Sequence, residues 1–233
     1  MNTKQRTTNT LFMLMSLDGK ISTGDTDELD FDKDLPNIQG VKEGLQQYYD
    51  IEGTTDIFSF NTGRVMEKIG INERKTKPEK ISVTFIIIDN KPHLTSEGIR
   101  YLTNWTRKLI LVTTNSSHPA VKMKQIENLE VLHYSYKIDF ENLFLKLKND
   151  FGAKRVTIQS GGEMNSELIR SNLIDNISLV IAPAIIGGRN TSTLVDGESL
   201  HKKSELEMIK PLELVSIKKL KNSYIHLRYK VIR

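Results

Sequence analysis

The sequence reads VTIQSGG over residues 156–162, and a helical pattern over residues 163–172 follows it directly. The β-branched start indicates a strand, and a glycine pair between a strand and a helix lets a ligand approach the backbone closely. The helix N-terminus adds unpaired N–H groups and the positive end of a dipole, which suits a pyrophosphate. A tight turn that needs glycine explains the stretch equally well. It is not the G-x-G-x-x-G pattern of a Rossmann dinucleotide site.

Strand-like runs alternate with helical patterns on both sides of this stretch. Strands are expected at 10–16, 56–61, 81–88, 108–113, 129–134, 155–159 and 177–183. Helices are expected at 38–49, 96–105, 119–125, 139–151 and 163–172, with one or two helical turns at 62–69. Residues 22–36 are polar and acidic and read as an exposed loop, and residues 212–231 read as a hairpin turning at Asn222-Ser223. The alternation predicts an α/β fold: a mixed, mostly parallel sheet flanked by helices, with a C-terminal antiparallel hairpin.

Composition bounds the class of protein. The 233 residues favour one domain over 1–233, with residues 1–8 as a flexible N-terminus. The chain has no cysteine, which excludes disulfides and thiolate chemistry and fits a cytoplasmic location. No run is long enough to span a membrane and the N-terminus lacks a signal peptide. The net charge of +4 comes from bases interspersed with acids, so we expect no nucleic-acid partner. The five histidines are dispersed, and no metal site is expected.

Three more stretches place polar residues where a strand runs into a turn. In open α/β sheets ligands gather outside the carboxyl ends of the strands, and arginine suits phosphate. The stretches are MSLDGK at 15–20 with Ser16, Asp18 and Lys20, FNTGR at 60–64 with Asn61, Thr62, Gly63 and Arg64, and APAIIGG at 182–188. Each also has a purely structural explanation, namely turn chemistry at Asp18-Gly19, a solvated Arg64, and a bulge or loop at the second glycine pair.

The order of these stretches resembles a known family. MSLDGKI at 15–21 is similar to the opening strand of the riboflavin-biosynthesis reductases, the C-terminal domains of bifunctional deaminase-reductases, whose fold is that of dihydrofolate reductase. The glycine pair at 161–162, then Leu173-Ile174-Asp175, Ala182-Pro183 and Gly187-Gly188, resembles the second signature of that family. NTGR at 61–64 is similar to the Gly-Arg turn of dihydrofolate reductases. The resemblance spans about residues 8–233.

The resemblance implies an NADPH-dependent reductase that acts on a small phosphorylated substrate such as 5-amino-6-(5-phosphoribosylamino)uracil. It implies catalytic or substrate-side roles for Ser16, Asp18 and Lys20. The cofactor would contact Asn61, Thr62, Gly63, Arg64, Asn90, Ser160, Gly161, Gly162, Glu163 and Met164. The resemblance also implies a homodimer, for which the C-terminal hairpin and the apolar strand 177–181 could supply the surface.

Two departures leave the substrate open. Ser160 stands where the family usually has a glutamate before the glycine pair, and residues 66–74 do not match its Asp-Asn-Pro segment. A lost carboxylate or arginine changes which polar substrate a pocket accepts. The alternatives are therefore an orphan reductase of a pterin or a carbonyl compound, or a nucleotide-binding protein without catalysis.

Overall fold

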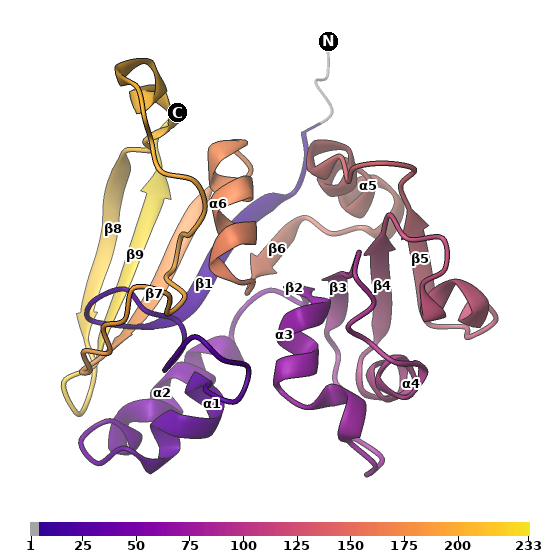
Figure 1. The fold of residues 1–233 in the computed structure, drawn as a ribbon, viewed down its shortest axis with the longest axis horizontal. Coiled ribbons are helices and arrows are strands. Elements are labelled where there is room, and N and C mark those ends of the chain that lie inside the picture. The colour runs from indigo at the N-terminus through magenta and orange to yellow at the C-terminus, as the bar shows by residue number, and fades with distance from the viewer. Residues whose placement is uncertain (1–4) are drawn as a thin grey trace. The chain divides into compact units, whose positions relative to one another are not determined.

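The fold is described from a computed structural model, which places residues 5–233 (Figure 1). The described chain divides into two compact units. The first unit comprises Asp56–Ser160 together with residues 5–7, and the second comprises Thr8–Thr55 and Gly161–Arg233. No helix within residues 5–233 is both long and apolar enough to cross a bilayer.

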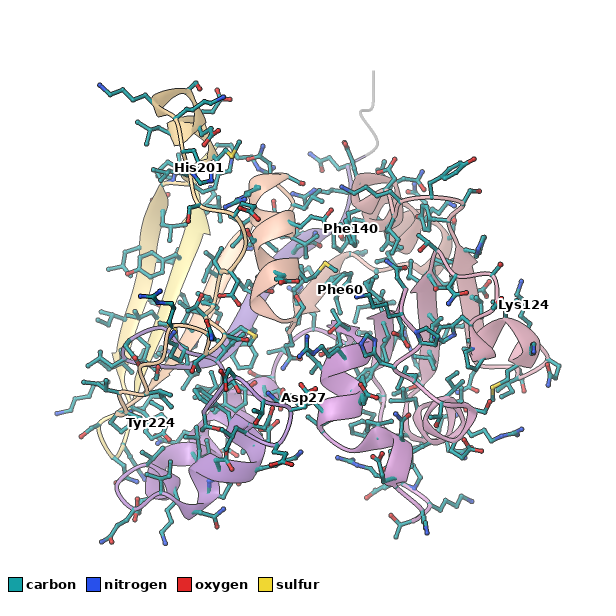
Figure 2. All side chains as sticks on the ribbon, in the orientation of Figure 1. Asp27, Phe60, Lys124, Phe140, His201 and Tyr224 are labelled. Atoms are coloured by element: carbon teal, nitrogen blue, oxygen red, sulfur yellow. The ribbon has the colours of Figure 1, made fainter. Side chains whose placement is uncertain are left out.

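The first unit is a parallel sheet with its helices in the connections. Its strands are ordered β5-β4-β3-β2-β6 and all pairs among them are parallel. The elements are β2 (Phe58–Thr62), α3 (Gly63–Lys68), η2 (Ile71–Glu73), β3 (Thr84–Ile88), α4 (Ser96–Trp105), β4 (Lys108–Thr113), η3 (Pro119–Met123), β5 (Leu129–His133), α5 (Phe140–Phe151) and β6 (Arg155–Ile158). Phe60 of β2 packs edge-on against Phe140 of α5 at 6.3 Å between ring centroids, which fixes that helix on the sheet (Figure 2).

The second unit adds the antiparallel hairpin. Its strands are ordered β1-β7-β9-β8, with β1 and β7 parallel and the remaining pairs antiparallel. The elements are β1 (Thr8–Ser16), α1 (Phe31–Asp34), η1 (Leu35–Asn37), α2 (Lys42–Glu52), α6 (Gly162–Arg170), β7 (Asn176–Ala182), η4 (Lys203–Met208), β8 (Leu212–Lys219) and β9 (Ile225–Val231). Tyr224 is buried at the hairpin (Figure 2) and its hydroxyl donates to the Val41 carbonyl at 2.8 Å. Phe12 stacks on Tyr48 at 5.2 Å, so α2 covers β1.

The predicted fold class is confirmed: the sheet is mixed and mostly parallel, helices flank it, and the chain closes with an antiparallel hairpin. The bounds of α4 and β4 are those expected from the sequence. Asn222 and Ser223 form the hairpin turn, with φ of 53° and 62°. The expectation of a single domain over 1–233 stays a prediction.

Three expectations were wrong. Residues 22–36 are not a plain exposed loop, because Phe31 and Leu35 are buried and α1 starts behind an Asp30 cap. The flexible N-terminus does not extend to residue 8, because Thr7 is 1% exposed and β1 starts at Thr8; residues 1–4 lie outside the described residues. The strand at 177–181 cannot pair with another copy, because β7 already has β1 and β9 as neighbours.

Candidate functional site

The turn after β1 is built around Asp18. The Ser16 hydroxyl donates to Oδ1 of Asp18 at 2.5 Å, and the backbone N–H groups of Ile186 and Gly187 donate to the same carboxylate at 3.1 and 2.7 Å. The Ser16 hydrogen bond, helped by the two backbone donors, lowers the pKa of Asp18 to about 2. Asp18 is thus a stable carboxylate that binds its own chain, a poor candidate for a general acid.

Lys20 also faces its own chain. Its Nζ donates to the carbonyls of Gly188 at 2.6 Å and Thr191 at 2.9 Å, and the residue is 8% exposed. The backbone N–H of Lys20 donates to Oγ of Ser16 at 2.9 Å. The expected substrate-facing cation is therefore a buried ammonium with two carbonyl partners. The structure brings Ser16, Asp18 and Lys20 together, but it directs Asp18 and Lys20 to residues 186–191 and keeps the Ser16 hydroxyl within the turn.

The glycine pair lies at the N-terminus of α6, as predicted. Gly161 is the N-cap, with φ −70° and ψ 163°, and no side chain caps the helix. A Cβ on Gly161 would meet nothing within 4 Å. The first-turn N–H groups and the open space beside Gly161 fit an anionic group such as a cofactor phosphate. The N-terminus of α6 therefore has room for an anionic group beside Gly161.

Gly162 serves a different purpose from Gly161. A Cβ on Gly162 would lie 2.3 Å from Oδ2 of Asp196 and 2.4 Å from the Thr193 carbonyl oxygen. The glycine is thus needed for the close approach of residues 193–196 to the helix. The motif alone cannot make this distinction, because it contains no information about which distant segment packs on each glycine.

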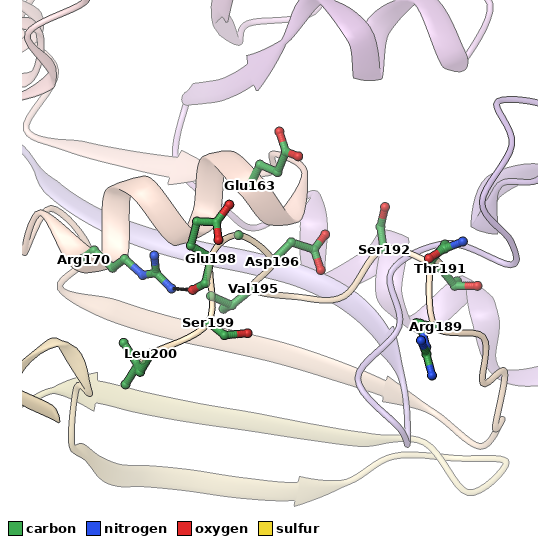
Figure 3. Close-up of a pocket in the computed structure, with 12 residues that line it drawn as sticks. Glu163, Arg170, Arg189, Thr191, Ser192, Val195, Asp196, Glu198, Ser199 and Leu200 are labelled. Carbon is green, nitrogen blue, oxygen red and sulfur yellow. Dashed lines mark hydrogen bonds between the residues drawn. The ribbon is translucent and has the colours of Figure 1, made fainter. Parts of the chain in front are cut away.

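The other predicted residues around α6 are Ser160, Glu163 and Met164. Ser160 is 1% exposed, Glu163 is exposed and Met164 is half-buried. Glu163 also lines a groove of about 690 Å³ between α6 and residues 189–200, where the side chains of Arg170, Arg189, Asp196 and Glu198 contribute mixed charge (Figure 3). The mixed charge gives this groove no preference for an anion, so the candidate phosphate position is the helix end beside Gly161.

The NTGR stretch lies in the first unit, where β2 runs into α3. Asn61 is buried within β2 and its Nδ2 donates to Oγ of Ser59 at 2.9 Å, so its side chain is used internally. Thr62 caps α3 through a hydrogen bond from the Val65 N–H at 3.4 Å. A Cβ on Gly63 would lie 2.3 Å from Cγ of Asp89, so this glycine makes room for a carboxylate. Arg64 is exposed at the start of α3.

Asn90 follows β3 and is exposed, with its Oδ1 accepting from the Thr114 N–H at 2.9 Å. Sequence reasoning missed its neighbour Asp89, a buried carboxylate that accepts from His118, His93 and the Leu94 N–H. The only available signal was a strand closed directly by an acid. The five histidines were interpreted as dispersed, yet two of them meet at this carboxylate. Within residues 5–233 no three metal-ligating side chains form a candidate metal site.

Comparison with known proteins identifies the family of this chain. Residues 8–226 match the model of the RibD C-terminal domain. The 2,5-diamino-6-ribosylamino-4(3H)-pyrimidinone 5′-phosphate reductase of Archaeoglobus fulgidus is 25% identical over 198 residues, which is 83% of this chain and 88% of the relative. The reductase of the same name from Methanothermobacter thermautotrophicus is 24% identical and covers 80% of this chain and 82% of its own. That from Aquifex aeolicus is 31% identical over 41% of this chain and 44% of its own.

Solved structures share the fold. RibD of Acinetobacter baumannii superimposes with a TM-score of 0.67 at 13% identity, covering 98% of this chain, which spans 59% of that protein. The riboflavin biosynthesis reductase Rib7 of Saccharomyces cerevisiae gives a TM-score of 0.62 at 18% identity, covering 100% of this chain and 92% of its own. At these identities the likeness establishes the fold alone.

Proposed function

Because the chain belongs to the RibD C-terminal domain family, we propose that it is a reductase of riboflavin biosynthesis acting on a ribosylaminopyrimidine 5′-phosphate. The observation that carries the proposal is the family match over residues 8–226. Relatives that are named as such reductases align with this chain over 88% and 82% of their own length. A cytoplasmic location is proposed with it, in keeping with the lack of cysteine.

NADPH is the proposed reductant. When bound, it supplies a hydride to a substrate carbon. The uncapped N-terminus of α6 and the space beside Gly161 support a phosphate position in the second unit. In the first unit we propose Thr62, Arg64 and Asn90 as cofactor contacts, because they lie where β2 and β3 end. Asn61 and Gly63 would act there through the backbone.

The proposed reaction opens the ribose of the substrate. The bond from C1′ to O4′ would break first, with O4′ taking a proton from solvent, which leaves a C=N bond at C1′. Hydride from the reductant would then convert C1′ into the CH2 group of a ribityl chain. The chain's own contribution is to hold the substrate and keep water away from C1′. Ser16 is the proposed substrate-side residue of the β1 turn, and its buried hydroxyl is shared with Asp18 and the Lys20 N–H.

The first substrate to test is 2,5-diamino-6-ribosylamino-4(3H)-pyrimidinone 5′-phosphate, for which the relatives are named. The second is 5-amino-6-(5-phosphoribosylamino)uracil, which carries an oxo group where the first carries an amino group. NADPH oxidation followed at 340 nm with each compound measures the preference directly. The proposal would be rejected if the protein turned over neither compound and also failed to restore growth to a riboflavin auxotroph that lacks its reductase.

A second candidate is a nucleotide-binding protein without catalysis. The specific observation in its favour is that Asp18 and Lys20, the charged residues expected at the substrate, bind residues 186–191 instead. Tight NADPH binding without oxidation, across pyrimidine phosphates, pterins and small carbonyl compounds, would support it. Turnover of a pterin or carbonyl compound alone would instead identify an orphan reductase.

We also propose a homodimer, formed by the face of the C-terminal hairpin that carries Leu214 and Ile217. Leu214 is 52% exposed and Ile217 is 63% exposed on the edge strand β8, beside Tyr229 and Leu227 of β9. An exposed apolar face on an edge strand marks an association surface, and two-fold pairing makes such a face self-complementary.

A further inference from the structure

The β1 turn, residues 16–21, is attached to a long loop that comes back from β7, residues 184–197, here called the return loop. Backbone hydrogen bonds join the two at both ends: Leu17 N–H donates to the Ala184 carbonyl at 2.8 Å, Ile21 N–H to Ser192 at 3.0 Å, and Leu194 N–H to Gly19 at 3.0 Å. Both segments belong to the second unit.

Side chains reinforce this attachment. Asp18 accepts from two N–H groups at 186–187, and Lys20 donates to the carbonyls of Gly188 and Thr191. Gly187 and Gly188 have φ of 72° and 83°, the left-handed region that favours glycine, and this conformation turns their backbone groups toward the two side chains. Burying the lysine head group without hydrogen-bond partners would be costly, so its two bonds to these carbonyls hold the Lys20 side chain in place.

The other end of the return loop covers the first turn of α6. Asp196 N–H donates to the Gly162 carbonyl at 3.0 Å, and Nδ2 of Asn165 donates to the Leu194 carbonyl at 2.8 Å. Thr193 holds the Asp196 carboxylate through its N–H at 3.0 Å and its hydroxyl at 2.6 Å. Figure 3 shows Asp196 on this segment beside α6. The contact at Gly162 is too close to admit a Cβ.

We propose that Asp18 and Lys20 are positioning residues, which hold the return loop and thereby fix residues 193–196 against the first turn of α6. The loop then sets the geometry of the uncapped N–H groups beside Gly161. The consequence for cofactor affinity rests on the proposed function, whereas the attachment of the loop does not. This role differs from the one implied by the resemblance, in which Lys20 acts on the substrate.

Amide hydrogen exchange of the full-length protein tests the attachment. Lys20→Met keeps the length of the side chain and removes its donors, and Lys42→Met, an exposed lysine of α2, is the matched control. Lys20→Met is expected to speed exchange at least tenfold in peptides covering 184–197 and 162–165, while Lys42→Met exchanges like the wild type. Unchanged exchange in Lys20→Met would overturn the proposal.

A nicotinamide fluorescence titration and steady-state rates test the consequence. In Lys20→Met the dissociation constant of NADPH is expected to rise at least tenfold, with kcat at saturating NADPH within threefold of the wild type. A large loss of kcat at unchanged affinity would make Lys20 catalytic and overturn the positioning role. If the wild type binds no NADPH, the proposed function fails, and hydrogen exchange still decides whether Lys20 holds the loop.

A second variant covers the case in which Lys20→Met does not fold. Thr193→Val is close in shape to the threonine and removes the hydroxyl that donates to Asp196. It is expected to speed exchange in 193–197 and at the start of α6, with residues 184–188 unaffected. Exchange at the start of α6 that stays at the wild-type rate would show that the loop does not govern this turn.

Discussion

The imidazole of His118 donates from Nε2 to Oδ2 of Asp89 at 3.0 Å, and both side chains are fully buried in the first unit. The Ala120 N–H donates to Nδ1 of His118, so the proton of the neutral ring is on Nε2. Burial alone would raise the pKa of Asp89, but hydrogen bonds from His118, Leu94 and His93 outweigh it and hold that pKa below its usual value. The pair thus anchors the turn that follows β3.

Removing the carboxylate should therefore be costly. Asp89→Ala leaves the N–H of Leu94 and the two imidazoles without their shared acceptor. Because each buried donor left unsatisfied costs about 1–3 kcal/mol, we expect the free energy of unfolding to fall by about 3–5 kcal/mol. Urea denaturation followed by Trp105 fluorescence measures this. Glu127→Ala, at an exposed position of the same unit, should stay within about 0.5 kcal/mol. A loss below about 1 kcal/mol for Asp89→Ala would contradict the anchoring role.

Local patterns predicted the elements well. The bounds of α4 and β4 and the turn at Asn222-Ser223 follow from caps, periodicity and turn residues within a short window. The prediction of an exposed loop at residues 22–36 was wrong because it relied on the same short window. Phe31 and Leu35 are surrounded by acidic residues, so the stretch looks polar although both side chains are buried in the core.

Contacts between distant segments could not be predicted in this way. His118 is 29 residues from Asp89, and Lys20 is 168 residues from the carbonyl of Gly188. The sequence therefore indicated that Lys20 lies at a strand end, but not that carbonyl groups of the return loop accept its hydrogen bonds. Likewise, the motif at 161–162 predicted a helix end correctly while leaving the separate purposes of its two glycines unresolved.

The pKa of Asp18 should depend on Ser16. Because the Ser16 hydroxyl is the largest cause of the low value of about 2, Ser16→Ala should raise it toward 3.8. A carboxyl with a lowered folded pKa stabilises the fold above about pH 4, and this contribution is lost as pH falls through about 2. Carbon-13 NMR of the labelled carboxyl over pH 1.5–6 measures the shift. Ser199→Ala, an exposed serine of the same unit, is the control, and an unchanged titration in Ser16→Ala would refute the assignment.

The hairpin face predicts the oligomeric state. Leu214→Lys places a charge in the proposed apolar interface and should convert a dimer into the 26.6 kDa monomer in sedimentation velocity at micromolar concentration. Glu213→Lys is the matched control, because the adjacent residue of a strand points to the opposite face. A wild type that sediments as a monomer, or a dimer that survives Leu214→Lys and fails with Glu213→Lys, would show that this face is not the interface.

The two glycines at the start of α6 should separate cofactor binding from stability. Gly161 adopts a backbone conformation open to alanine, and its Cβ would enter empty space, so Gly161→Ala should cost no more than about 1 kcal/mol of unfolding free energy. That space is the proposed phosphate position, and we expect NADPH to bind at least tenfold more weakly, about 1.4 kcal/mol. Gly162→Ala forces apart Thr193, Asp196 and the helix, and should cost about 1–3 kcal/mol of unfolding free energy. Urea denaturation of both variants measures the unfolding free energies, and nicotinamide fluorescence titration measures NADPH affinity. Wild-type NADPH affinity in Gly161→Ala would show that the phosphate does not lie at this helix end. A loss of affinity would support the proposed position, because no distant part of the described chain lies within 4 Å of the new Cβ.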